Sequence, residues 1–165
     1  MPVTPSGMLS VPDALLRTML SNCPAFRTWT GTANPTAALA RIHLIVKPAA
    51  AARPFALIDF GGEFNAQRNA GGSQHYFQHS GSLLLLFEDD VDSANAADGK
   101  DADAEYEFRN NLGAVLSELE DLAGRDDNLT ISRMTVLVSP ARTHVDERAT
   151  LGDYYQTILE VTWGP

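Results

Sequence analysis

His75 and His79 are the residues of this chain that first suggest metal binding, because imidazole is a common zinc ligand. They lie four positions apart in a polar segment that we expect to be extended, where their side chains would point the same way about 13 Å apart. No cysteine, aspartate or glutamate stands nearby at the spacing of a ligand set. We therefore expect two solvent-facing histidines, no metal site and no cofactor.

Glu88, Asp89, Asp90 and Asp92 form an acidic run that could bind a divalent cation or exchange protons with a substrate. The run lacks the central glycine and the terminal glutamate of the regular oxygen-ligand loop. We interpret it as the solvated end of a strand.

The glycine pairs Gly61-Gly62 and Gly71-Gly72 could belong to phosphate-binding loops. Neither pair leads into a predicted helix, and neither is followed by the Lys-Ser/Thr that holds phosphate and Mg²⁺. Ser82, Ser139 and His144 do not lie in a nucleophile-elbow sequence. We expect turn glycines, no catalytic residues and a protein that is not an enzyme.

The length, charge and composition limit the classes of protein to which this chain can belong. The 165 residues suit a single domain, residues 1–165, and the formal charge of −9 argues against nucleic-acid binding, which needs a surface of lysine and arginine. The one cysteine, Cys23, is expected to be a buried structural residue in a reducing compartment. Since we see no signal peptide and no apolar run of roughly 18–20 residues, we expect a soluble, cytosolic product without a membrane span.

The chain is organised around the stretch from Leu83 to Phe87, four leucines followed by a phenylalanine. Apolar residues at successive positions place hydrophobic side chains on both faces, which is typical of a buried strand. Gly81 precedes the run and acidic residues follow it, so a strand is favoured over a buried helix. We expect a central strand covered by helices on one face and by another element on the other.

Two main helices are predicted from apolar residues at helical spacing. The first covers residues 11–22, with Ser10 as N-cap and Asp13 in the place of a capping-box acid. The second covers residues 104–123 and carries one apolar stripe, formed by Phe108, Leu112, Val115, Leu116, Leu119 and Leu122. Residues 25–29 are interpreted as a short turn and residues 36–40 as a short helical piece.

Further strands are expected at residues 41–47, 55–60, 129–138 and 153–163. The first alternates in polarity, with Ile42, Leu44 and Val46 on one face. The last alternates in the same way, with its apolar face formed by Tyr155, Leu159, Val161 and Trp163.

The order of these elements predicts an α+β fold, because consecutive strands are joined by short turns. We expect a mostly antiparallel or mixed sheet of four to five strands packed against one long and one short helix. Residues 1–10 are expected to form a flexible arm, and residues 91–103, which are small and acidic, a flexible loop.

Residues 62–80 are predicted to form a β-hairpin that projects from the sheet. Two polar extended pieces, residues 64–69 and 74–79, flank the turn Ala70-Gly71-Gly72-Ser73. The hairpin has too few large apolar side chains for a core element, so we expect it to contact an adjacent subunit or another protein. The residues expected to make this contact are Phe64, Gln67, Arg68, Gln74, Tyr76, Phe77 and Gln78.

Five segments, in their order along the chain, resemble the tail-terminator (tail-completion) proteins of long-tailed bacteriophages and prophages. They are Ala38-Leu39-Ala40-Arg41-Ile42-His43, Ile58-Asp59-Phe60-Gly61, Ala70-Gly71-Gly72, Gly81-Ser82-Leu83-Leu84-Leu85-Leu86-Phe87-Glu88 and Gly152-Asp153-Tyr154-Tyr155. The resemblance spans residues 12–163 and consists of hydrophobic strands and turns, not of a catalytic signature.

The resemblance implies a structural virion protein that assembles into a ring, usually a hexamer, on the head-proximal end of the tail tube. Such a ring stops tube polymerisation and offers a docking surface to the head connector. The implied partners are further copies of the chain, the major tail tube protein and the head–tail connector protein, and DNA would pass through the channel without specific binding.

The implied location is the tail or neck of the virion, and the host cytoplasm during assembly. Two alternatives stay open. One is another head–tail connector, neck or minor capsid component, and the other is a small enzyme or ligand-binding domain with a concave sheet.

Overall fold

A computed structural model describes residues 4–5, 10–59, 63–68, 77–90, 101–125, 129–138 and 154–164 of the chain. The helices are α1 (Val11–Asn22), α2 (Pro24–Trp29), α3 (Pro35–Ala38), the 3-10 helix η1 (Leu39–Arg41) and α5 (Asp101–Arg125). The strands are β1 (Ile42–Leu44), β2 (Phe55–Asp59), β3 (Phe64–Arg68), β4 (Phe77–Asp90), β5 (Leu129–Val138) and β6 (Tyr154–Trp163).

Strand β4 is the centre of the sheet, as the run of leucines predicts. The main strands lie in the order β1-β2-β4-β6-β5, and β3 pairs with the first part of β4. Strands β1 and β2 are parallel, whereas the other neighbouring strands are antiparallel. The predicted α+β fold with a mixed sheet is therefore confirmed.

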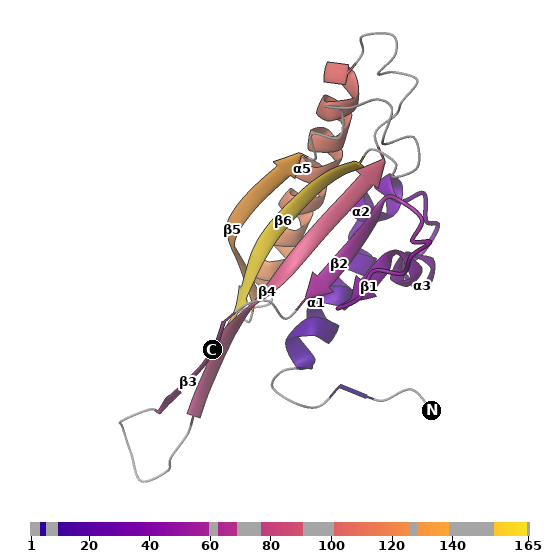
Figure 1. The fold of residues 1–165 in the computed structure, drawn as a ribbon. Coiled ribbons are helices and arrows are strands. Elements are labelled where there is room, and N and C mark those ends of the chain that lie inside the picture. The colour runs from indigo at the N-terminus through magenta and orange to yellow at the C-terminus, as the bar shows by residue number, and fades with distance from the viewer. Residues whose placement is uncertain are drawn as a thin grey trace.

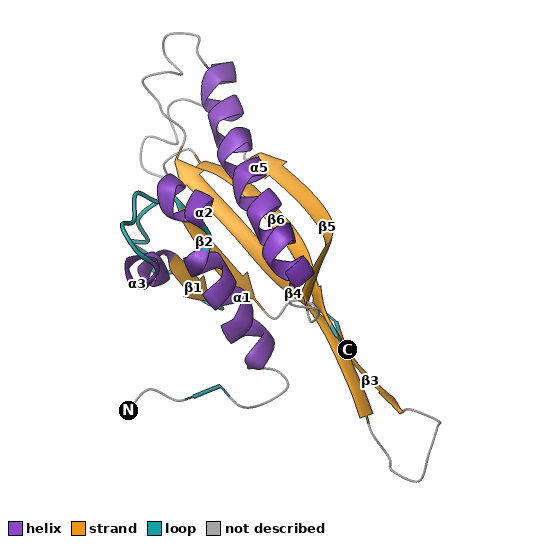
Figure 2. Cartoon of the chain, turned by 180° about the vertical axis from the view of Figure 1, so that it is seen from behind, coloured by secondary structure: helices purple, strands orange, loops and turns teal. Residues whose placement is uncertain are grey.

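All the described helices lie on one face of the sheet (Figures 1 and 2). Leu83, Leu85 and Phe87 are fully buried on this side of β4. Fully burying one such side chain stabilises the fold by about 1.5–3 kcal/mol, so this layer holds the helices on the sheet. The predicted stripe of α5 belongs to it: Phe108, Leu112, Val115 and Leu119 are buried, and Leu116 and Leu122 pack against them.

The opposite face of the sheet has no described helix, and at one end of it the segment that joins β1 to β2 covers the buried Glu88 through Lys47 and Arg53. Leu84 and Leu86 on this face are half-buried, whereas the leucines of the other face are fully buried. The hydrophobic run marks a central strand correctly. On the face opposite the helices, the described residues cover this run only in part. We call this side the helix-free face.

Strand β1 is shorter than predicted and does not alternate. Ile42 is buried, but Leu44 is 39% exposed and Val46 is 71% exposed. The strand ends because Ile45 has a φ of 65°, and the backbone turns there so that the Val46 N–H donates to the Leu44 carbonyl oxygen. A residue with positive φ cannot continue an extended strand.

Three helical segments differ from the prediction, since the piece predicted at residues 36–40 is α3 followed by η1, and α2 and α5 differ as well. Residues 24–29 form α2 instead of a turn, and α5 begins at Asp101, so three residues that were assigned to the acidic loop are helical. The remainder of that loop, residues 91–100, lies outside the described residues, as does most of the arm at residues 1–10.

A carboxylate from α5 explains why α2 forms. Glu118 accepts hydrogen bonds from the Ala25 N–H at 2.8 Å and from the Cys23 Sγ–H at 2.9 Å. It thereby satisfies a backbone donor that the first turn of a helix leaves without an intrahelical partner. Cys23 is fully buried, as predicted, and burial, with Glu118 second, raises the pKa of its thiol to about 12.

Helix α1 has the predicted bounds but not the predicted capping box. Ser10 precedes the helix without a side-chain capping bond, and Asp13 is buried in the first turn. Burial, and secondly the carboxylate of Asp59, raise the pKa of Asp13 to about 6. Asp13 is therefore a buried acid of the core and does not cap the helix.

Candidate functional site

Strand β3 and the first part of β4 form a two-stranded ribbon that projects beyond the rest of the described sheet (Figures 1 and 2). Strand β4 runs without interruption for 14 residues, so its first part pairs with β3 and its second part lies between β2 and β6. The register places Phe64 opposite Gly81 and Arg68 opposite Phe77. The projecting ribbon is thus a direct continuation of the central strand.

Aromatic packing fixes the base of this ribbon. The ring of Phe64 stacks on His79, with centroids 5.7 Å apart, and lies 6.1 Å from the ring of Trp163 at the end of β6. Gly81 permits the approach, because a Cβ there would lie 2.6 Å from the Glu63 carbonyl oxygen and 2.9 Å from the Trp163 ring. Phe64 is still 47% exposed. The base therefore combines a fixed geometry with an accessible aromatic ring.

The predicted contact residues differ in how much of them the structure describes. Gln67 pairs with Gln78 and Arg68 with Phe77 in the ladder of the ribbon, but only the backbone of these four residues is described. Gln74 and Tyr76 lie outside the described residues. Phe64 is the one member of the predicted set whose side chain can be placed, and it lies at the base of the ribbon.

The histidines and the acidic run also differ from the prediction in how deeply they are buried. His79 is half-buried against Phe64 instead of solvent-facing, whereas His75 lies outside the described residues. The acidic run is not a solvated strand end at its first two positions. Glu88 is only 3% exposed, and the half-buried Asp89 accepts a hydrogen bond from the Trp29 Nε1–H at 2.7 Å.

Two basic residues explain the burial of Glu88. Both Lys47 and Arg53 form ion pairs with its Oε1 atom, and Arg53 also binds Asp90 at 3.0 Å. Lys47 and Arg53 come from the segment that joins β1 to β2 and lies over Phe55, whose ring centroid is 5.2 Å from Lys47 Nζ. The sequence could not reveal this network, because its members lie 35 and 41 positions apart.

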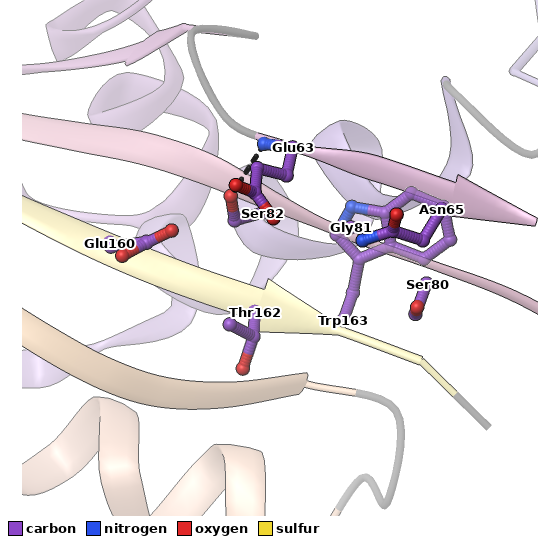
Figure 3. A pocket seen from close by; sticks show the side chains of 8 residues that line it. All are labelled: Glu63, Asn65, Ser80, Gly81, Ser82, Glu160, Thr162 and Trp163. Atoms are coloured by element: carbon purple, nitrogen blue, oxygen red, sulfur yellow. Dashed lines mark hydrogen bonds between the residues drawn. The ribbon is translucent and has the colours of Figure 1, made fainter.

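A hollow of about 290 Å³ lies where the ribbon leaves the sheet (Figure 3). Its walls are formed by Glu63, Asn65, Ser80, Gly81, Ser82, Glu160, Thr162 and Trp163. Glu63 and Ser82 hold one side together, since the Glu63 N–H donates to Ser82 Oγ at 2.9 Å and the Ser82 N–H donates to the Glu63 carbonyl oxygen at 2.8 Å. The lining of the hollow thus combines two acidic residues, Glu63 and Glu160, with hydroxyl, amide and indole side chains.

The helix-free face beside this hollow is apolar at its centre. Leu57 pairs with Leu86, and Leu86 pairs with Ile158, so three half-buried aliphatic side chains form a row across three strands, with Leu84 next to it. Asp59 and Glu160 stand opposite Leu84 on either side of it. The face thus has an aliphatic centre, with Asp59 and Glu160 at one end and the ion-paired Glu88 at the other.

Within the described part of the chain, no three histidine, cysteine or acidic side chains are grouped as a metal site would require. No described helix combines the length and hydropathy of a membrane span. A scan against protein-family models and a search of the curated proteins both found no match to the chain.

Proposed function

We propose that this chain is a structural virion protein, a phage tail terminator that forms a ring on the head-proximal end of the tail tube. There it stops tube polymerisation and provides the docking surface for the head connector. The observation that carries the proposal is the projection of β4 with β3 beyond the sheet as a two-stranded ribbon.

The physical argument for a partner is that an isolated two-stranded ribbon is marginally stable in water. The outer edge of β3 has no partner strand within the described part of the chain, and the ring of Phe64 is 47% exposed. Strand edges of this kind gain order when they pair with, or pack against, another protein. The ribbon is therefore assigned to contacts with the tail tube or with an adjacent subunit.

A ring also accounts for a second feature, the helix-free face. A heterologous contact between two different surfaces of the same chain closes into a ring when the rotation between copies is a simple fraction of a turn. The ribbon and the helix-free face are two such different surfaces. The net charge of −9 suits a channel through which DNA slides without specific binding.

Negative-stain imaging of the purified protein, alone and with tail tubes, tests the proposal. Closed rings, expected to be hexamers, and tubes that carry one ring at a single end are the supporting result. Rings that do not cap tubes would instead favour another component of the head–tail connector. Only monomers at high protein concentration, with tubes left uncapped, would contradict both assignments.

A further inference from the structure

Strand β5 forms one edge of the sheet and is long for an edge strand. It has ten residues, and within the described part of the chain it pairs only with β6. Natural proteins usually shorten their edge strands or interrupt them with proline, charge or bulges, because unpaired backbone groups can bind other strands. Residues 133–138 contain no proline, Arg133 is their only charged residue, and the bulge of β5 lies before them. This part of β5 is therefore an open edge.

The opposite edge of the sheet, formed by β1, is protected. Strand β1 has only three residues, and the backbone leaves the sheet at Ile45, whose φ of 65° cannot continue an extended strand. A short strand that ends in a turn offers few backbone groups to a partner. The contrast between the two edges favours strand addition at β5 over strand addition at β1.

The outer edge of β3 is a second open edge. The Ser82 N–H donates to the Glu63 carbonyl oxygen at 2.8 Å, so Glu63 directs its backbone groups toward β4. Successive residues of an antiparallel strand direct these groups alternately to the two sides. The register of β3 has no shift, so Phe64, Ala66 and Arg68 direct their N–H and C=O away from β4. Phe64 and Ala66 are also exposed.

The same alternation shows which residues of β5 face outward. Since the Ser82 N–H points to β3, the preceding Gly81 directs its backbone groups to its partner Trp163 on the other side of β4. Ile158, five residues before Trp163, then faces β5, where its partner is Thr135. The neighbours of Thr135 point the other way. The outward-facing residues of the open edge of β5 are Met134, Val136 and Val138.

The two open edges face opposite sides of the sheet. Gly81 pairs with Phe64 on one side and with Trp163 on the other, so β3 and β6 flank β4, and β5 lies beyond β6 (Figure 3). Each step from β3 through β4 and β6 to β5 is antiparallel, so β3 and β5 run in opposite directions. Each edge presents three outward residues at a spacing of two. The edges are thus complementary in direction and in hydrogen-bonding pattern.

We infer that the outer edge of β3 pairs as an antiparallel strand with residues 134–138 of β5 in a second copy of this chain. This inference rests on the proposed ring, because it names the backbone contact that joins neighbouring subunits. Matching the outward residues places Ala66 opposite Val136, with a hydrogen-bonded pair on either side. The ribbon, which is marginal as two strands, thereby gains a third.

A second copy fits these edges better in a ring than in a symmetric dimer. Pairing β5 with β5 would join two copies and leave the β3 edge of each copy open. Pairing β3 with β5 joins two different surfaces, so it is heterologous and closes into a ring when the rotation between copies allows it. In that ring every copy uses both of its open edges.

Disulfide trapping between separately made variants tests the contact. Gln67→Cys and Thr135→Cys are prepared as two proteins, mixed in equal amounts and oxidised with diamide. The matched register makes these positions a non-hydrogen-bonded pair with Cα atoms about 4.5 Å apart, within reach of a disulfide. Cys23 does not interfere, because it is fully buried. We expect a covalent dimer in the mixture only. A dimer from Thr135→Cys alone would overturn the inference, since it would indicate a symmetric β5–β5 contact.

Two proline substitutions test the backbone pairing. Ala66→Pro and Val136→Pro each remove an outward N–H, and an edge strand tolerates proline where that N–H faces outward. Each should raise the concentration needed for ring formation roughly tenfold or more. Ala66 is exposed on the ribbon, so this variant should keep the parent circular-dichroism spectrum even if Val136→Pro fails to fold.

Ala49→Pro is the matched control for Ala66→Pro. Ala49 is an exposed alanine in a turn, away from both open edges, in which the Ala51 N–H donates to the Pro48 carbonyl oxygen at 3.1 Å. Proline suits the first central position of such a turn. The rings of this variant should form at the parent concentration.

The outcomes separate this inference from the proposed function. Normal rings from Ala66→Pro and Val136→Pro, with no mixed disulfide, would overturn the edge pairing and leave the tail-terminator proposal intact. A mixed disulfide from a protein that caps no tubes would support the edge pairing and overturn the proposed function.

Discussion

Asp13 is an acidic residue that is buried in the first turn of α1. It is 9% exposed, and its Oδ1 atom is buried without a hydrogen-bond partner among the described residues. A buried carboxylate without a partner is disfavoured relative to its neutral acid, which is why the pKa rises from 3.8 to about 6. The acid is therefore more easily accommodated in its protonated form.

The sign of the pH dependence follows from this shift. Below pH 3.8 the Asp13 side chain is protonated in both the folded and the unfolded chain, and its contribution to stability is fully present. As pH rises toward about 6, Asp13 ionises first in the unfolded chain, and this contribution is lost. Asp13→Asn should therefore raise the free energy of unfolding at pH 7 by about 1–2 kcal/mol relative to the parent.

Chemical denaturation of both proteins at several values between pH 4 and pH 7 measures the effect. The difference between variant and parent should be small at the acidic end and grow with pH. Glu120→Gln, at an exposed carboxylate of α5, serves as the control and should show no such growth. A difference for Asp13→Asn that stays constant over the whole range would show that its ionisation is not coupled to folding.

Substitution by alanine should change the free energy of unfolding in opposite directions at Gly81 and at Gly113. Gly81→Ala places a Cβ 2.6 Å from a backbone oxygen and 2.9 Å from the Trp163 ring, so the base of the ribbon must shift. Overpacking of this kind lowers the free energy of unfolding by about 1–3 kcal/mol. Thermal and chemical denaturation should show this loss, together with a changed tryptophan fluorescence spectrum.

Gly113→Ala is the matched control for Gly81→Ala. Gly113 lies within α5, and an added Cβ there meets nothing within 4 Å. Alanine should therefore stabilise the protein by about 0.5–1 kcal/mol, because glycine is the poorer helix former. Equal effects at the two positions would contradict the close packing described for the ribbon base.

At the scale of elements, we expect the outer part of the ribbon to contribute little to the stability of the rest of the fold. Phe64, His79 and Trp163 pack at its base, and β3 continues beyond that contact to Gln67 and Arg68. Replacing residues 66–76 by a short Gly-Ser turn should move the thermal midpoint by less than about 4 °C. The same variant should lose ring formation or tube capping if the ribbon makes the proposed contact.

Circular dichroism and imaging with tail tubes measure the two properties on the same sample. A native spectrum with uncapped tubes is the expected combination. Tubes that are still capped at normal length by the shortened protein would show that the ribbon is not the contact.

At the scale of the whole molecule, charge governs the relation to DNA. The chain has 21 acidic and 12 basic residues, and phosphate binding requires clustered lysine and arginine. The protein should therefore not retard duplex DNA in a gel even at about 50 mM salt, where electrostatic binding is strongest. Retardation that weakens steeply with added salt would contradict a channel through which DNA passes without binding.

Much of the architecture was predictable because it rests on local signals. The bounds of α1 and β5, the stripe of α5 and the central place of β4 follow from hydrophobic periodicity, which depends on near neighbours in the sequence. The polar composition of residues 62–80 likewise indicated a hairpin outside the core, because such a segment cannot bury enough apolar surface to join it.

The tertiary structure decided what depends on contacts between distant residues. Strand β1 ends at Leu44, and the segment after its turn is held by Glu88 about 40 positions away; α2 begins where Glu118, 93 positions from Ala25, accepts its N–H. The burial of Glu88 and the close approach at Gly81 arise in the same way. No local pattern encodes them, because the pairing of strands and helices first brings these atoms together.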